Sequence, residues 1–285
     1  MAVRALFDVP APAKLNRHLH IVGRRADGYH LIDSRLVLLD WIDTLHFERR
    51  DDGRLARHDL GAPLPADDLC LRAARGLQRA AGTEQGADIS IDKCVPWGAG
   101  LGGGSSDAAS TLLALNVLWG LDWPLARLLP LGLSLGADVP FFLAGTPARV
   151  GGIGEVLVPE RHEAVWYAVL KPATGLSTQA VFARPEVAEC VEAARIAGFS
   201  QDVERNDLQA SAEALCPDVA RAAALLFDSF GNSRMTGSGS AVFARAGDGP
   251  APVAAMPQAR LEGWTGRMCR SLGRHPLAGW ASGKS

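Results

Sequence analysis

The stretch that decides the fold reads Pro96-Trp97-Gly98-Ala99-Gly100-Leu101-Gly102-Gly103-Gly104-Ser105-Ser106-Asp107 and has five glycines within seven residues. The alternating pattern of residues 88–95 predicts a strand before it, and the Ala- and Leu-rich residues 105–118 predict a helix after it. Glycine is costly to order, so the cluster indicates positive φ or a ligand close to the main chain. A strand-to-helix turn directs several amide N–H groups and the positive helix end to one point. The sequence therefore predicts a phosphate-binding loop.

Two other interpretations of this stretch have to be weighed. A flexible turn with Ser105 as a helix N-cap would also be rich in glycine and serine. Gly98, Gly100 and Gly103 satisfy the dinucleotide-binding pattern G-x-G-x-x-G. That pattern belongs in a β-α-β unit, however, and the helix after Ser105 continues into a second helix, residues 124–135, without an intervening strand. The length and placement of the loop favour a phosphate site.

Composition excludes several classes of protein. The 285 residues are 48% hydrophobic, which is enough for one large or two ordinary domains with a real core. The net charge is −2, from 29 Lys and Arg against 31 Asp and Glu, so nucleic acid and anionic membranes are not expected partners. The start of the chain matches neither a signal nor a transit peptide, and no stretch is long and apolar enough to span a membrane. The five cysteines are scattered, which favours reduced thiols and a cytoplasmic location.

The rest of the chain predicts mixed α and β structure. Alternating residues predict two strands at 15–22 and 34–47 joined by the polar loop Arg24-Arg25-Ala26-Asp27-Gly28-Tyr29-His30. Apolar residues at helical spacing predict a helix over 68–81. Further elements are predicted as follows: short strands in 147–159, a strand at 166–170, helices near Gln179, Asp207 and Asp218, a strand pair bent around 236–240, and a helix and a strand within 253–269. A boundary near residues 150–165 would give two α+β domains that share a cleft.

The loop resembles the phosphate loop of the GHMP kinase superfamily. Four other motifs, Ala13-Lys14-Leu15-Asn16, Arg25-Ala26-Asp27-Gly28-Tyr29-His30, Gly136-Ala137-Asp138-Val139-Pro140-Phe141 and Thr236-Gly237-Ser238-Gly239-Ser240, are similar in order and spacing to those of one branch, the kinases that act on 4-diphosphocytidyl-2-C-methyl-D-erythritol. The resemblance extends over residues 10–245. Agreement of several separated motifs makes it specific.

The resemblance implies a fold and a reaction. The fold is α+β and has two domains: residues 1–158 form an N-terminal ATP-binding domain like ribosomal protein S5 domain 2, and residues 159–285 form a ferredoxin-like C-terminal domain. The reaction is transfer of the ATP γ-phosphoryl group, with Mg²⁺, to a hydroxyl of 4-diphosphocytidyl-2-C-methyl-D-erythritol, in the non-mevalonate route to isoprenoid precursors. The implied partner is this small molecule, and the expected state is a monomer or a weak homodimer.

The resemblance also assigns roles to residues. Asp138 accepts or orients the proton of the substrate hydroxyl, and Lys14 keeps that carboxylate ionised and compensates developing charge. The residues expected to hold the nucleotide are Lys93, Pro96, Gly98, Gly100, Leu101, Gly102, Gly103, Gly104, Ser105 and Ser106. Those expected to hold the acceptor are Asn16, Tyr29, His30, Asp138, Thr178 and Phe182, with Tyr29, His30 and Phe182 around the cytosine base. No carboxylate matches the position of the second Mg²⁺ ligand of mevalonate kinase, so the metal ligands stay unassigned.

Two residues depart from the pattern, since Asp68 and Asp107 stand where asparagine is common, and each adds negative charge near the nucleotide.

Three alternative functions stay open. The first is a kinase for another small alcohol, such as homoserine or mevalonate, although these have no base for Tyr29 to stack on. The second is an inactive ligand sensor, which the presence of Lys14 and Asp138 disfavours. The third is a decarboxylase that phosphorylates its substrate transiently.

Overall fold

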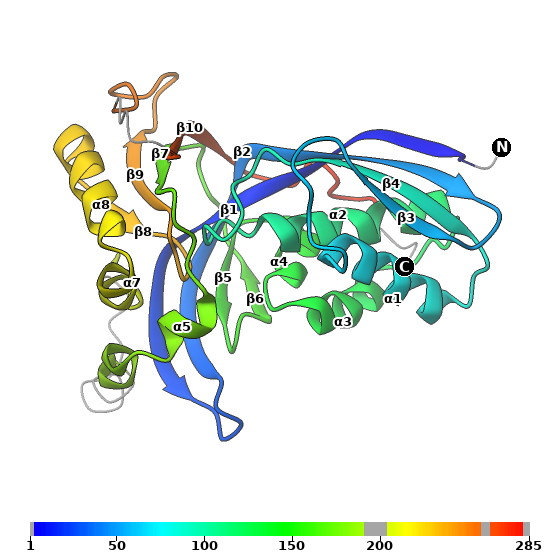
Figure 1. The fold of residues 1–285 in the computed structure, drawn as a ribbon, viewed down its shortest axis with the longest axis horizontal. Helices are drawn as coiled ribbons and strands as arrows, with labels where there is room; N and C mark the ends of the chain where they lie inside the picture. The colour runs from blue at the N-terminus through cyan, green and yellow to red at the C-terminus, as the bar shows by residue number, and fades with distance from the viewer. Residues whose placement is uncertain (1–2, 191–203, 258–262, 282–285) are drawn as a thin grey trace.

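A long β-hairpin spans the molecule (Figure 1) in the computed structural model, which describes residues 3–190, 204–257 and 263–281. Its arms are β1 (Ala5–Arg24) and β2 (His30–Arg50), which pair antiparallel from Ala5 opposite Glu48 to Arg24 opposite His30. The predicted strand, loop and strand are confirmed, but both arms are longer than predicted. The prolines near the start of β1, Pro10 and Pro12, are tolerated because among the described strands β1 pairs with β2 alone, and an edge strand can spare an N–H donor.

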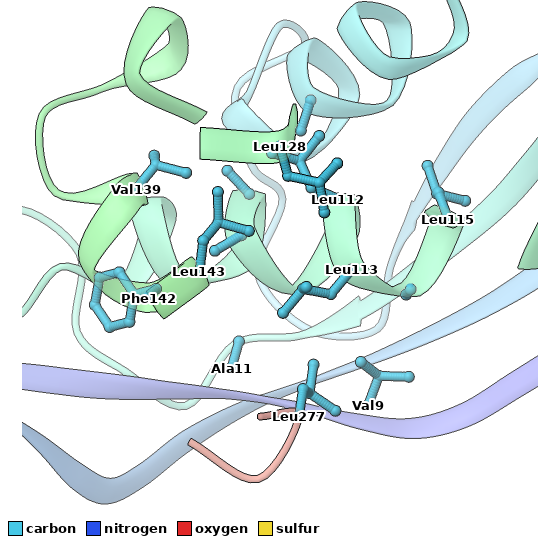
Figure 2. Close-up of a cluster of buried hydrophobic side chains, with 14 of the residues drawn as sticks. Val9, Ala11, Leu112, Leu113, Leu115, Leu128, Val139, Phe142, Leu143 and Leu277 are labelled. Atoms are coloured by element: carbon cyan, nitrogen blue, oxygen red, sulfur yellow. The ribbon is translucent and has the colours of Figure 1, made fainter. Parts of the chain in front are cut away.

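The first half of the chain packs four helices on one face of the sheet (Figure 1). These are α1 (Leu69–Ala81), α2 (Gly103–Leu118), α3 (Leu125–Leu135) and α4 (Val139–Ala144). Figure 2 shows Leu112 and Leu113 of α2 beside Leu143 of α4, above Ala11 of β1. The helix α2 is central in this layer and buried on nearly all sides, so its sequence is apolar without a polar stripe.

The helices predicted over 68–81 and 124–135 are confirmed as α1 and α3. The Asp68 side chain accepts from the Leu71 amide at 3.0 Å and caps α1, which ends at Gly82 with φ 62°. Pro124 precedes the first residue of α3, as expected of a proline at a helix start. These helices were predictable because their boundaries depend on neighbouring residues only.

Ten strands form one sheet in the described part of the chain, in the order β3-β4-β2-β10-β7-β9-β8, with β1 and β5 paired to β2 and β6 paired to β5. The remaining strands are β3 (Leu55–Asp59), β4 (Gly86–Asp92), β5 (Ala148–Gly151), β6 (Val156–Pro159), β7 (Trp166–Lys171), β8 (Arg234–Met235), β9 (Val242–Gly247) and β10 (Thr265–Leu272).

The second half adds its own helices and core. The helices α5 (Thr178–Phe182), α7 (Gln209–Leu215) and α8 (Pro217–Phe230) lie beside β7, β8 and β9, at the left of Figure 1. Their core includes Leu19 and Ile21 from the far part of β1. Of the predicted pair within 253–269, the strand is confirmed as β10. The helix is wrong for residues 253–257, which are irregular, and residues 258–262 lie outside the described residues.

The two halves share strands. The end of β10 pairs with the middle of β2, Ser271 opposite Leu39, and Leu277 then packs in the core of the first half. The predicted boundary at 158/159 falls between β6 and β7 and stays a prediction. In the described residues, no helix is both long enough and apolar enough to cross a bilayer.

Candidate active site

The glycine-rich loop connects β4 to α2 and lies against the turn after β8. Its main chain has positive φ at Gly98, Gly100 and Gly102, at 64°, 76° and 72°. A Cβ on Gly100 would lie 2.3 Å from the carbonyl oxygen of Thr236, so a side chain there would collide with the opposite main chain. A Cβ on Gly102 would lie 2.9 Å from Cγ of Lys14. Glycine is therefore required here for close packing between the two halves.

At the start of α2 the loop presents amides that have no acceptor among the described residues. The residue before the helix is Gly102, which supplies no side-chain cap, and the Ser106 amide donates back to the Gly102 carbonyl at 2.9 Å. The amides of Gly103, Gly104 and Ser105 precede this bond and so have no partner inside the helix. Ser105 lies within the first turn of α2, so it is not the helix N-cap that the alternative interpretation of a flexible turn requires. Three free amides at a positive helix end suit a phosphate.

Two cavities meet at this loop. One, of about 360 Å³, is lined by Lys14, Asn16, Leu19, Ile32, Gly98, Gly100, Gly102, Ser105, Ala137, Asp138, Ile153, Leu176, Thr178, Phe182, Leu208, Gly237, Ser238 and Gly239. The other, of about 220 Å³, is lined by Leu69, Lys93, Val95 and residues 96–105. Gly98, Gly100, Gly102 and Ser105 line both, so the loop is the wall between two adjacent ligand spaces.

Lys14 and Asp138 lie together in the larger cavity. Lys14 Nζ is 3.6 Å from Asp138 Oδ2, and the two side chains are 4% and 38% exposed. The Lys14 amide donates to the Leu101 carbonyl at 2.9 Å, which fixes β1 against the loop. Asp138 stands just before α4 but makes no side-chain capping bond, so its carboxylate is available to the cavity. The structure thus joins two residues that are far apart in the sequence.

Asn16 connects this pair to the second half of the chain. Its side-chain oxygen accepts a hydrogen bond from Lys14 Nζ, and its amide nitrogen donates to Ser34 Oγ at 2.8 Å. Its backbone N–H donates to Thr236 Oγ1 at 2.9 Å. Because these bonds are buried, Lys14 is held in one position.

The far end of the larger cavity is aromatic and polar. The rings of His30 and Phe182 are stacked with centroids 5.2 Å apart, and Phe182 lines the cavity. Partial burial, together with Arg24, lowers the pKa of His30, so the imidazole is neutral at neutral pH. Thr178 Oγ1 and Ser238 Oγ lie 2.8 Å apart and both line the cavity.

Three residues from the sequence prediction, Tyr29, His30 and Ser106, do not line either cavity. The Tyr29 side chain is 62% exposed, in the loop between β1 and β2. Ser106 is fully buried, and its hydroxyl has no hydrogen-bond partner among the described residues. His30 lies against Phe182, and the remaining predicted residues line one or both cavities. The roles predicted for these side chains remain predictions.

Lys93 lies beside the smaller cavity between two carboxylates. Its Nζ donates to Asp43 and, at 2.5 Å, to Asp107 Oδ2. Asp43 is fully buried and also accepts from the amides of Cys94 and Val95, at 2.6 and 2.7 Å. The Lys93 charge is therefore compensated inside the protein, and Asp43 fixes the main chain that enters the loop.

Lys93 carries one positive charge, so the buried group of Lys93, Asp43 and Asp107 would have a net charge of −1 if both carboxyls were ionised. Burial raises the pKa of Asp107 to about 8, although Lys93 acts in the opposite direction. Burial alone would lower the pKa of Lys93, but Asp107 and Asp43 outweigh it and raise that pKa. Asp107 is thus the carboxyl that retains its proton at neutral pH.

We expect Asp107→Asn to change the pH dependence of stability. Because the pKa of Asp107 is raised, the folded wild type holds a proton that the unfolded chain has lost. The stability contributed by this proton is full below about pH 4 and disappears as the pH rises to about 8. The asparagine variant lacks this loss. The difference in unfolding free energy between the variant and the wild type, measured by urea unfolding, should therefore rise between about pH 5 and pH 8, by up to about 1.4 kcal/mol per pH unit. The exposed Asp228→Asn is the control, and a pH-independent difference for Asp107→Asn would contradict the assignment.

Sequence reasoning missed Asp43, although a signal was present. The buried positions of β2 alternate through Trp41, Asp43, Leu45 and Phe47, so the period of two places an aspartate on the buried face. A charged residue on that face needs a buried partner. Asp68, which like Asp107 stands where asparagine is common, caps α1 and pairs with Arg57 at 3.1 Å. It does not line the smaller cavity.

Comparison with known proteins agrees with this geometry. Residues 68–146 match the family model of the GHMP kinases N terminal domain, and residues 184–258 match that of the GHMP kinases C terminal domain. A protein of Methylibium petroleiphilum named 4-diphosphocytidyl-2-C-methyl-D-erythritol kinase is 61% identical over 286 residues, which cover 99% of this chain and 100% of that protein. One of the same name from Verminephrobacter eiseniae is 52% identical, over 98% of this chain and 99% of the relative.

Solved structures give the same result for the fold. A 4-(cytidine 5'-diphospho)-2C-methyl-D-erythritol kinase superposes with a TM-score of 0.71 at 32% identity, over 94% of this chain and 100% of that one. The homoserine kinase of Cytophaga hutchinsonii has a TM-score of 0.67 at 17% identity, over 95% of each chain, and shows the fold alone. The predicted two-domain α+β fold is confirmed. The chain belongs to the GHMP kinase family, in the branch of the 4-diphosphocytidyl-2-C-methyl-D-erythritol kinases.

Proposed function

We propose that this protein transfers the γ-phosphoryl group of ATP to a hydroxyl of 4-diphosphocytidyl-2-C-methyl-D-erythritol, a step toward isoprenoid precursors. The observation that carries the proposal is the shared wall: Gly98, Gly100, Gly102 and Ser105 line both cavities, and Lys14 and Asp138 line the larger one. A phosphate bound at the loop is then next to both an acceptor space and a carboxylate. The names of the relatives that match over nearly the whole chain support the same reaction.

ATP binds with its phosphates at the loop. The free amides of Gly103, Gly104 and Ser105 and the positive end of α2 hold phosphate oxygens without a charged side chain. Mg²⁺ bound with ATP would neutralise charge on the β- and γ-phosphates. The described residues contain no cluster of three or more metal-ligating side chains, which fits an ion that retains waters and is held mainly by phosphates. The Ser105 hydroxyl, on a residue that lines both cavities, would be one protein ligand of this ion.

The acceptor hydroxyl lies at Asp138. Phosphoryl transfer passes through a loose transition state, so the protein acts by positioning and by stabilising charge. Asp138 accepts or orients the hydroxyl proton, while the Lys14 ammonium, 3.6 Å away, compensates charge on the transferring group. Asn16 and Thr178 hold the methylerythritol or diphosphate portion of the acceptor.

The cytosine base lies at the aromatic end. His30 covers one face of the Phe182 ring, so a base would stack on that face by displacing the imidazole, which would then lie beside the base. Stacking does not read base edges, so the neutral His30 imidazole supplies a hydrogen bond for discrimination, and Tyr29 would cover the base from the exposed loop.

The test is ADP release by the purified protein with Mg²⁺ and ATP, compared for 4-diphosphocytidyl-2-C-methyl-D-erythritol, homoserine, mevalonate and galactose. Turnover with the cytidyl acceptor alone is the expected result. Turnover with another alcohol would overturn the roles of Tyr29, His30 and Phe182 while leaving a kinase. No turnover with any acceptor, despite ADP binding, would favour a ligand sensor.

A further inference from the structure

The turn after β8, residues 236–240, forms one wall of the larger cavity. Gly237, Ser238 and Gly239 line that cavity and do not line the smaller one. A Cβ on Gly237 would lie 3.3 Å from Lys14 Nζ, so the main chain of the turn packs against the ammonium. The position of this turn therefore limits both the space for the acceptor and the space around Lys14.

The side chain of Asn206 holds this turn in place. Its amide nitrogen donates to the carbonyl oxygens of Met235 and Gly237, at 2.9 and 2.8 Å, on either side of Thr236. Its oxygen accepts from the Leu208 amide at 2.9 Å. Asn206 is only 7% exposed, and both N–H donors and the oxygen of its side chain are bonded to the main chain. These bonds fit an asparagine and no other residue of the same shape.

Asn206 is itself fixed to β1, the strand that carries Lys14. The Leu19 amide donates to the Arg205 carbonyl at 2.9 Å, and the Asp207 amide donates to the Leu19 carbonyl at 2.8 Å. These two bonds make a parallel bridge between Leu19 and Asn206. The turn is therefore tied, through one side chain, to the strand that positions the ammonium.

Removing the Asn206 side chain would leave two carbonyl groups, those of Met235 and Gly237, without these donors. An unsatisfied buried acceptor is costly, so the turn would lower its free energy by moving these groups toward water in the cavity. Such a movement changes the wall of the acceptor space and the contact with Lys14.

The nucleotide side of the wall has separate anchors. The Ala241 amide donates to the Ala99 carbonyl at 3.0 Å, and the Lys14 amide donates to the Leu101 carbonyl at 2.9 Å. Neither bond involves Asn206. Loss of the Asn206 side chain should therefore affect the acceptor more than ATP.

We propose that Asn206 is a positioning residue for the acceptor. By holding the turn after β8 against β1, it sets the shape of the acceptor space beside Lys14. The proposal rests on the proposed function, because it assumes that the acceptor occupies the larger cavity.

The experiment measures kcat and both KM values by ADP release for the wild type, Asn206→Ala and Asn206→Asp. We expect Asn206→Ala to raise the KM for the acceptor about tenfold and to lower kcat by up to about tenfold, because a misplacement of about 1 Å can cost about 10²-fold in rate. The KM for ATP should stay within about threefold of the wild type. Asn206→Asp keeps the shape and the oxygen that accepts from Leu208, but it places an oxygen opposite two carbonyl groups, so it should lose at least as much.

Asn232→Ala is the matched control, because Asn232 makes the same set of bonds elsewhere. Its nitrogen donates to the carbonyls of Phe230 and Arg245 at 2.9 and 3.0 Å, and its oxygen accepts from the Arg245 amide at 2.8 Å. It lines neither cavity, so Asn232→Ala should lower the melting temperature and leave both KM values unchanged. The same pattern in Asn206→Ala would mean a purely structural role and would overturn the proposal. Equal rises of both KM values would also overturn it.

A calorimetric titration with the cytidyl acceptor alone separates this proposal from the proposed function. Turnover of that acceptor with an unchanged KM in Asn206→Ala would overturn the positioning role and leave the kinase. Weaker acceptor binding by Asn206→Ala than by the wild type, in a protein without turnover, would support the positioning role and overturn the kinase. A wild type that neither binds nor turns over the acceptor would overturn both.

Discussion

Asp138→Asn is expected to lower kcat by about 10²- to 10⁴-fold, the contribution typical of a positioned general acid or base. Asparagine has nearly the same shape but cannot accept a proton from the acceptor hydroxyl. Asp138 is 38% exposed and makes no capping bond, so the variant is expected to fold, although the buried Lys14 ammonium loses its carboxylate neighbour. The KM for ATP should change little, because the phosphate loop is untouched. Steady-state ADP release, with both substrates varied, measures these effects.

The exposed Asp228→Asn on α8 makes the same chemical change outside the cavities and should retain wild-type kcat. Thermal unfolding of both variants shows whether the fold is intact. A kcat for Asp138→Asn within about threefold of the wild type would remove Asp138 from the reaction, because that loss is far below the contribution of general base catalysis.

Lys14→Met is expected to lower kcat by about 10²- to 10³-fold, the typical effect of removing one preorganised group that stabilises transition-state charge. Methionine keeps the length of the buried stem but removes the ammonium that faces Asp138. The Lys14 side chain is only 4% exposed, so exchanging it for an apolar group spares the cost of burying a charge. The melting temperature should therefore stay the same or rise while activity falls.

Lys14→Arg is not expected to rescue activity. Gly102 lies directly against the Lys14 stem, and the wider guanidinium would have to fit between the loop and β1. Lys171→Met is the control, because Lys171 is also a buried lysine, bonded to the Ala173 carbonyl at 3.0 Å and absent from both cavities. A fall in activity and melting temperature together for Lys14→Met would indicate a structural role instead.

Many local features of this protein were predictable from neighbouring residues. The glycine cluster between an alternating segment and an apolar run predicted the strand, loop and helix at residues 88–118 because each depends on local spacing. Asp68 and Gly82 mark the ends of α1 in the same way. The helix predicted near residue 253 is wrong at residues 253–257. The strand predicted at 15–22 is too short, because β1 also includes Pro10 and Pro12, which local rules disfavour inside a strand.

The sequence by itself determined the motifs, the loop and the helix ends, because backbone conformation there depends on residues close in the chain. Only the tertiary structure decided that Lys14 meets Asp138, that Lys93 lies between Asp43 and Asp107, and that Gly100 touches the turn at Thr236. It also decided that Trp97 is left exposed at a cavity. These contacts join residues far apart in the sequence, and burial and electrostatics depend on which groups the folded chain brings within a few ångströms.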